Sequence, residues 1–125
     1  MEQKTSLVRH FQDLRVWKEA HAFSLAVYQA TQRFPKDELY GLTSQFRRAA
    51  VSIELNIAEG SKRETTKDLC HFLNMSEGST EEAKCLLLLA RDLRYIEQTL
   101  FQTLWDKASV ISAMLNSLIR SLRSV

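Results

Sequence analysis

Apolar residues recur along the chain in alternating steps of three and four, the spacing that places side chains on one face of an α-helix. Four stretches show this pattern and predict helices over residues 14–34, 42–59, 66–95 and 100–123. The first two apolar stripes consist of Val16, Ala20, Phe23, Val27, Ala30 and Phe34, then Leu42, Phe46, Ala49, Ile53 and Ile57. The third and fourth consist of Leu69, Phe72, Ser76, Ser79, Ala83, Leu86, Ala90 and Leu93, then Phe101, Leu104, Ala108, Ile111, Leu115, Leu118 and Leu122.

Polar residues and glycines mark where these helices begin and end. Asp13 is placed to be the N-cap of the first helix, and Pro35 ends that helix. Gly60 follows the second stripe at a C-cap position, where a residue that tolerates positive φ is favoured.

The third and fourth helices begin at capping-box spacings. Ser61 to Glu64 and Thr65 to Asp68 both fit the start of the third helix, and the sequence does not decide between them. Thr99 to Gln102 fits the start of the fourth. Gly78 lies inside the third stripe, but the stripe keeps its phase, so one continuous helix is expected, bent at most at that residue.

The connections between the four predicted helices are short, which favours antiparallel neighbours. We therefore expect an all-α fold, an antiparallel up-down-up-down four-helix bundle forming one domain over residues 1–125. A long helical hairpin that completes its bundle with another chain is the alternative.

The second and third helices carry more apolar surface than one bundle needs. Val51, Leu55 and Ala58 lie roughly opposite the core stripe of their helix, and the run from Leu87 to Leu89 points in three directions. Thick packing in a small core is one explanation, but self-association explains a second apolar face better. The expected homo-oligomer interface consists of Val51, Leu55, Ala58, Leu88 and Leu89.

The composition supports a helical protein of a reducing compartment. A chain of 125 residues with 45% hydrophobic residues can bury a core without disulfides, and three Gly and one Pro are few for a β-sandwich or barrel. Cys70 and Cys85 show no CxxC spacing, which favours the cytoplasm. Residues 1–10 are too polar for a signal peptide, and the longest apolar run, 85–90, is too short to span a bilayer.

Three groups of residues are candidates for a reactive site, and none fits one well. The pair Asp68-x-x-His71 is similar to an element of di-iron bundles, but such a centre needs that element twice, and here it occurs once. Glu77, Glu81 and Glu82 fit a solvated acidic face better than an acid–base pair. There is no Gly-rich phosphate loop, and the three histidines are far apart. We expect no metal, no cofactor and no enzymatic activity.

Basic residues form small clusters along a chain whose net charge is only +2, with a pI near 8.6. Acidic residues lie near the clusters, so a solvated surface of mixed charge is at least as favoured as a phosphate track for each one alone. Self-association changes that balance because symmetry repeats a weak patch. The candidate nucleic-acid-binding residues are Arg47, Arg48, Lys62, Arg63, Lys67, Arg120 and Arg123.

Short motifs between Asp13 and Leu93 resemble a bacterial family, the four-helix-bundle proteins encoded in intervening sequences of 23S ribosomal RNA genes, also called S23 ribosomal proteins. The matching stretches are Asp13-Leu14, Val16-Trp17, Phe34-Pro35, Glu38, Tyr40-Gly41-Leu42, Gln45, Arg47-Arg48-Ala49, Val51-Ser52-Ile53, Asn56-Ile57-Ala58-Glu59-Gly60, Arg63, Phe72, Gly78-Ser79 and Glu82. The sequence departs from the family at Glu54-Leu55 and at Met75-Ser76.

The resemblance implies a bundle that assembles into a ring, typically a homopentamer, with a link to RNA or another nucleic acid. Related bundles act beside a reverse transcriptase in diversity-generating retroelements, so a protein partner of that kind is also implied. Two hypotheses follow: an oligomeric module that binds RNA mainly through phosphates, or a scaffold that binds a partner protein without intrinsic nucleic-acid binding.

Overall fold

A computed structural model describes residues 8–124 of the chain, and helices make up almost all of it. The four α-helices are α1 (Arg15–Thr31), α2 (Leu42–Gly60), α3 (Thr66–Asp92) and α4 (Gln98–Arg123). Two short 3-10 helices, η1 (Phe11–Asp13) and η2 (Lys36–Glu38), precede α1 and α2. No strand occurs within residues 8–124, so the expected all-α, four-helix fold is confirmed.

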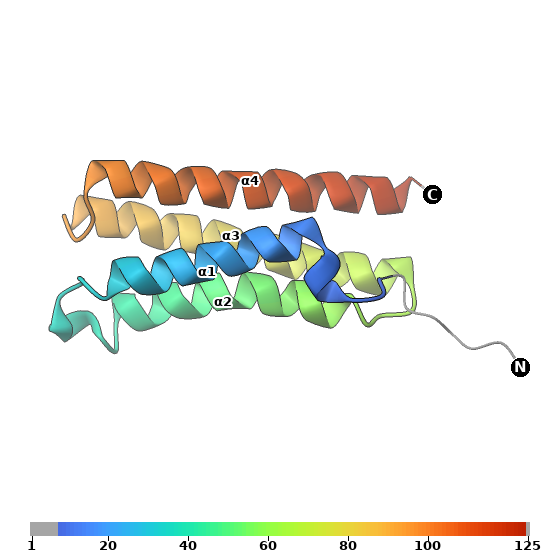
Figure 1. Cartoon of the computed structure of the whole chain (residues 1–125), viewed down its shortest axis with the longest axis horizontal. Helices are drawn as coiled ribbons and strands as arrows, with labels where there is room; N and C mark the ends of the chain where they lie inside the picture. The colour runs from blue at the N-terminus through green and yellow to red at the C-terminus, as the bar shows by residue number, and fades with distance from the viewer. Residues whose placement is uncertain (1–7, 125) are drawn as a thin grey trace, which may run out of the picture.

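The four helices lie side by side along the long axis of the molecule, and the chain reverses between successive helices (Figure 1). α1 packs against α2 and α4, and α3 packs against the same two helices. Each helix therefore touches two neighbours and encloses one shared core. The turn after α2, the start of α3 and the end of α4 lie at one end of the bundle, and the turns after α1 and α3 lie at the other (Figure 1).

The apolar stripes of α1 and α2 form half of this core, as the sequence predicts. Every residue of both predicted stripes is buried, and Phe23, Phe46, Ile53 and Ile57 have no exposed surface. α1 ends at Thr31 rather than at residue 34, but Phe34 still packs inside, against Phe46 at 6.5 Å between ring centroids. Heptad spacing alone is thus sufficient to identify the buried faces of these two helices.

The predicted stripe of α3 is displaced in part. Leu73 and Thr80 are completely buried, whereas the predicted Phe72 and Ser79 are half-buried and Leu93 is exposed. Phe72 lies at the edge of the α2–α3 contact, where the Arg63 guanidinium covers its ring at 4.7 Å. Ser79 shares a hydrogen bond of 2.8 Å with Ser52 of α2. Both residues therefore belong to the seam between two helices rather than to the core.

The stripe of α4 is correct from Phe101 to Leu115, all of which are buried, but it drifts near the end. Leu118 and Leu122 are only half-buried, and Ile119 is buried in their place. A straight α-helix drifts relative to a strict seven-residue repeat, so the last turns present a different residue to the core.

The structure decides between the alternative helix starts. The Thr65 hydroxyl accepts a hydrogen bond from the backbone N–H of Asp68 at 3.1 Å, so Thr65 caps α3. The prediction for Asp13 is wrong, because Asp13 lies within η1 and Leu14 precedes α1 without a side-chain cap. The prediction for Thr99 is also wrong: α4 begins at Gln98, after Glu97.

Gly60 is required for close packing rather than for a left-handed cap. It is the last residue of α2 and its φ is not positive, which corrects the expected role. A Cβ atom at Gly60 would lie 2.8 Å from the Cβ of Phe72 on α3 and 3.3 Å from Cδ1 of Leu69. Gly78, in contrast, faces open space and does not interrupt α3.

Within residues 8–124, no helix has both the length and the apolar character needed to cross a membrane.

Candidate functional site

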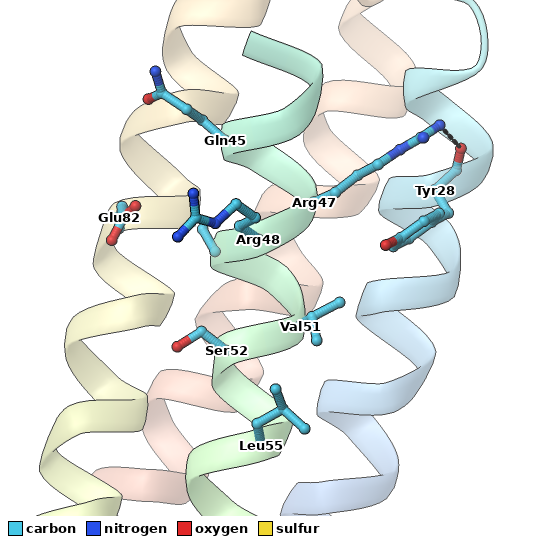
Figure 2. Close-up of a pocket in the computed structure, with 9 residues that line it drawn as sticks. Tyr28, Gln45, Arg47, Arg48, Val51, Ser52, Leu55 and Glu82 are labelled. Carbon is cyan, nitrogen blue, oxygen red and sulfur yellow. Dashed lines mark hydrogen bonds between the residues drawn. The ribbon is translucent and has the colours of Figure 1, made fainter. Parts of the chain in front are cut away.

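A groove of about 720 Å³ runs over the outer face of α2, between α1 and α3 (Figure 2). α2 supplies most of its lining, α1 supplies Tyr28, and α3 supplies Glu82. The α2 residues in the groove are Gln45, Arg47, Arg48, Ala49, Val51, Ser52 and Leu55. The groove thus combines an apolar strip with one acidic and two basic side chains.

Arg47 and Arg48 are neighbours in sequence with different surroundings. Arg47 is half-buried and turns toward α1, where its Nε donates to the Thr31 hydroxyl at 2.8 Å and its Nη2 donates to the Tyr28 carbonyl at 3.4 Å. Its guanidinium also lies 4.6 Å from the centroid of the Tyr28 ring. Arg47 therefore stabilises the C-terminal turn of α1, where carbonyls lack helical partners. The Nε and Nη2 groups of Arg47 are therefore already used in hydrogen bonds within the bundle.

Arg48 is exposed and extends over the groove toward Glu82 of α3 (Figure 2). Among the described residues it forms no ion pair within 4.0 Å. Of the two arginines predicted to bind nucleic acid in this cluster, Arg48 is the one whose charge is available to a partner.

The predicted oligomer interface is only partly brought together on this face. Leu55 and Leu89 are 59% and 47% exposed, and Val51 and Ala58 of α2 are half-buried. Leu88 instead packs against the core. Exposed apolar side chains also extend beyond the predicted set, to Leu25 on α1 and to Met75 on α3. Met75 and Leu89 flank Glu82 at seven-residue spacing, so the three share one face of α3.

The remaining candidate basic residues lie around the end of the bundle where α2 ends, α3 begins and α4 ends (Figure 1). From Arg48 to the end of α2 at Gly60 is about 12 residues, roughly 18 Å at 1.5 Å per residue, and Arg63 lies beyond that end. The candidate nucleic-acid-binding residues therefore lie on two separate surfaces.

Two of these basic residues converge on a pocket of about 460 Å³ between α3 and α4. Lys67 and His71 line it from the first turns of α3, and Arg123 lines it from the last turn of α4, together with Thr66, Cys70, Asn74 and Leu122. No acidic side chain belongs to this lining, and Lys67 and Arg123 form no ion pair within residues 8–124. We call Lys67, His71 and Arg123 the basic pocket.

The neighbouring basic residues differ in whether other side chains already contact them. Arg63 is engaged twice, by Glu59 at 3.3 Å and by the face of the Phe72 ring. Lys62 and Arg120 are exposed. His71 is a member of this site that the sequence does not predict. It shares the pocket with Arg123 only because α3 and α4 pack against each other.

The residues considered for catalysis do not form a reactive cluster. Within residues 8–124, no group of three or more His, Cys, Asp or Glu side chains is arranged to hold a metal ion. The edge of the His71 ring meets Phe72, with ring centroids 5.5 Å apart. Cys70 is buried and Cys85 is exposed.

Burial against α4 raises the pKa of the Glu77 carboxyl, and the neighbouring Ser112 and Asn116 side chains oppose that rise in part.

The profile of the family described as 23S rRNA-intervening sequence protein matches residues 12–117. The chain belongs to this family. The resemblance seen in the short motifs is therefore confirmed. The family match also extends through most of α4, a helix that contains none of those motifs. No curated protein sequence matches the chain.

A similar solved structure is that of a protein of unknown function from the S23 ribosomal protein family of Bacteroides thetaiotaomicron. The two chains are 20% identical, with a TM-score of 0.76, over 83% of this chain and 97% of the other. At that identity the similarity establishes the fold. In this member of the 23S rRNA-intervening sequence family, six of the thirteen motif residues on α2 line the groove together with Glu82, and Leu42, Ile53 and Ile57 lie in the core.

Proposed function

We propose that this family member is a non-enzymatic cytoplasmic module, an antiparallel bundle that assembles into a ring of identical copies, typically five, and binds the phosphate backbone of structured RNA. The basic pocket carries the proposal. Lys67 and Arg123 approach it from two helices without an acidic partner in the lining. An unneutralised pair of cations attracts anions.

The contacts expected from such a pocket are to phosphate rather than to bases. Lys and Arg side chains neutralise phosphates and release counterions, which gives affinity without sequence readout. Lys62 and Arg120, exposed near the same end, extend the basic surface. Arg48 forms a separate contact point on α2.

One pocket with two permanent cations is a weak site, so the proposal also requires several copies. The exposed apolar side chains Leu25 on α1, Leu55 on α2 and Leu89 on α3 support self-association, since a monomer gains nothing from exposing them. A ring presents the same pocket repeatedly to one RNA molecule, which raises the overall affinity by effective concentration. Light scattering at micromolar concentration should give several times the protomer mass of 14.4 kDa.

RNA binding across a range of salt concentrations tests the pocket. The double variant Lys67→Gln/Arg123→Gln should bind every RNA sequence more weakly. Its plot of log affinity against log salt should be flatter by about 0.7 to 0.9 for each phosphate that the variant no longer neutralises. Arg33→Gln/Arg94→Gln removes the same charge at the opposite end of the bundle and should leave the slope unchanged. Arg48→Gln, measured alone, tests whether the basic side chain exposed on α2 contributes to RNA binding.

A protein-interaction scaffold is the second candidate function, and the groove favours it. An apolar strip bordered by Arg48, Gln45 and Glu82 has the composition of a protein interface, apolar at the centre and polar at the rim. Equal salt slopes for the wild type and the basic-pocket variant, with the oligomer mass unchanged, would reject the basic pocket as the RNA site, and no binding of RNA by the wild type would reject the RNA-binding proposal in favour of this one.

A further inference from the structure

The turn between α1 and α2 exposes an apolar pair. Tyr40 is 93% exposed and Leu39 is 49% exposed, just after η2 and just before α2. Tyrosine is among the residues that contribute most to protein interfaces, because its ring covers a large area at little conformational cost. We call Leu39 and Tyr40 the apolar knob.

Contacts on both sides hold the backbone of this turn in place. The Glu38 carboxylate accepts a hydrogen bond from the Leu42 backbone N–H at 3.2 Å and another from the Tyr95 hydroxyl at 2.9 Å. The first contact ties the turn to the start of α2, and the second ties it to the turn between α3 and α4. The chain enters η2 through Pro35, whose ring restricts φ. The backbone that carries the knob is therefore held in place, which lowers the entropic cost of binding.

The same surface also offers a receptor for such a knob. The α2 groove presents Val51, Leu55 and the Tyr28 ring as apolar contacts. Its volume of about 720 Å³ lies within the roughly 300–1,000 Å³ range of pockets that hold compact ligands, so it has room for a Leu and a Tyr side chain. The groove border carries the charges of Arg48 and Glu82.

The charges beside the knob complement those beside the groove. Lys36 and Asp37, both exposed, precede the knob, and Glu38 between them and the knob is used by its two hydrogen bonds. Each member of the exposed pair has an opposite charge at the groove, in Glu82 and Arg48. A protomer cannot fill its own groove in this way. From the start of α2 at Leu42 to Leu55 is about 13 residues, or roughly 20 Å.

We propose that the apolar knob of one copy inserts into the α2 groove of the next copy. The inference rests on the self-association in the proposed function and specifies its contact. The knob and the groove are different patches of one protomer. Each copy therefore inserts its knob into one neighbour and accepts the knob of another neighbour in its groove. Such a head-to-tail contact closes into a ring when its rotation closes, unlike a two-fold contact, which stops at a dimer.

Disulfide trapping between two different variants tests this pairing without removing the knob. In a Cys85→Ser background, which removes the exposed native thiol, one variant carries Asp37→Cys beside the knob and the other Gln45→Cys at the groove. Mixed and oxidised, the two should form a cross-linked dimer on a non-reducing gel. Neither variant should cross-link alone. Cross-linking of the Asp37→Cys variant with itself would mean that knobs meet each other, which overturns the proposal.

A second measurement uses the knob itself. Tyr40→Ala should weaken self-association at least about 30-fold, the effect of truncating an interface residue that contributes about 2 kcal/mol. Val110→Ala, which shortens a 48% exposed side chain on α4, should leave the association constant unchanged. An oligomeric wild type without mixed cross-links, or with no effect of Tyr40→Ala, overturns the knob-and-groove contact and leaves the proposed function standing. A monomeric wild type overturns both the contact and the ring.

Discussion

The contact between α2 and α3 can be tested with one substitution made at two glycines. At Gly60 a methyl group would lie 2.8 Å from the Phe72 Cβ, an atom attached directly to the α3 backbone and unable to rotate away. Gly60→Ala therefore requires the two helices to move apart. At Gly78 the same methyl group meets no atom within 4 Å. The two variants have the same chemistry, and the structure predicts opposite signs for their effects on stability.

The magnitudes follow from two competing effects. Replacing Gly by Ala within a helix stabilises by about 0.5–1 kcal/mol, because the unfolded chain loses conformational freedom. Overpacking a tight contact costs about 1–3 kcal/mol. Gly78→Ala should therefore raise the free energy of unfolding by about 0.5–1 kcal/mol, and Gly60→Ala should lower it by roughly 1–2 kcal/mol.

Equilibrium unfolding in urea measures both variants, at one fixed protein concentration, because the proposed self-association would make the unfolding free energy depend on that concentration. A Gly60→Ala variant stabilised as much as Gly78→Ala would show that α2 and α3 separate without cost and that the close approach is not required. A destabilising Gly78→Ala would show that this face of α3 is covered by another chain or that the helix is bent there.

Three further predictions concern the core, a carboxyl group and a strained turn. Leu86→Ala and Leu115→Ala should each lower the unfolding free energy by about 2–5 kcal/mol, with the larger loss at the fully buried Leu115. Burial raises the pKa of Glu77 in the folded protein, so folding becomes less favourable as pH rises through that pKa. Glu77→Gln should therefore be more stable than the wild type at pH 7, with an advantage that shrinks toward pH 4.5, the group's ordinary pKa, in unfolding measured at both pH values. Arg94, at the end of α3, adopts φ of 65°, and Arg94→Gly should raise the melting temperature because a left-handed backbone costs a non-glycine residue about 1–2 kcal/mol.

The buried faces could be predicted from the sequence where a helix presents one simple stripe. This holds for α1 and α2, whose predicted stripes are entirely buried. α3 differs because its seam with α2 carries polar and apolar side chains alongside the core stripe. Phe72 and Ser79 belong to its contact with α2, while Leu73 and Thr80 lie at the centre of the core. A single repeat cannot distinguish a seam from a core when polar and apolar residues occur in both.

The candidate sites were less predictable, because they depend on contacts between distant parts of the chain. Nothing in the order Arg47-Arg48 shows that the first side chain turns inward to Thr31 and Tyr28 while the second remains exposed. The meeting of Lys67 with Arg123 follows only from the reversal of the chain between α3 and α4. The sequence identified most of the basic residues of these surfaces but could not group them.

The separation of the two surfaces has a consequence for how they would work together. The α2 groove begins near the turn that carries the knob, whereas the basic pocket lies at the other end of the bundle, at the start of α3 (Figure 1). A contact between copies at the groove would therefore leave the pocket open to RNA. Tyr40→Ala, which removes no charge, should then lower the affinity for a long RNA by separating the copies. The same variant should bind an RNA short enough to reach one pocket as well as the wild type does. Equal loss of affinity for both RNA lengths would mean that Tyr40 contacts the RNA itself, and no loss for either would mean that each copy binds independently.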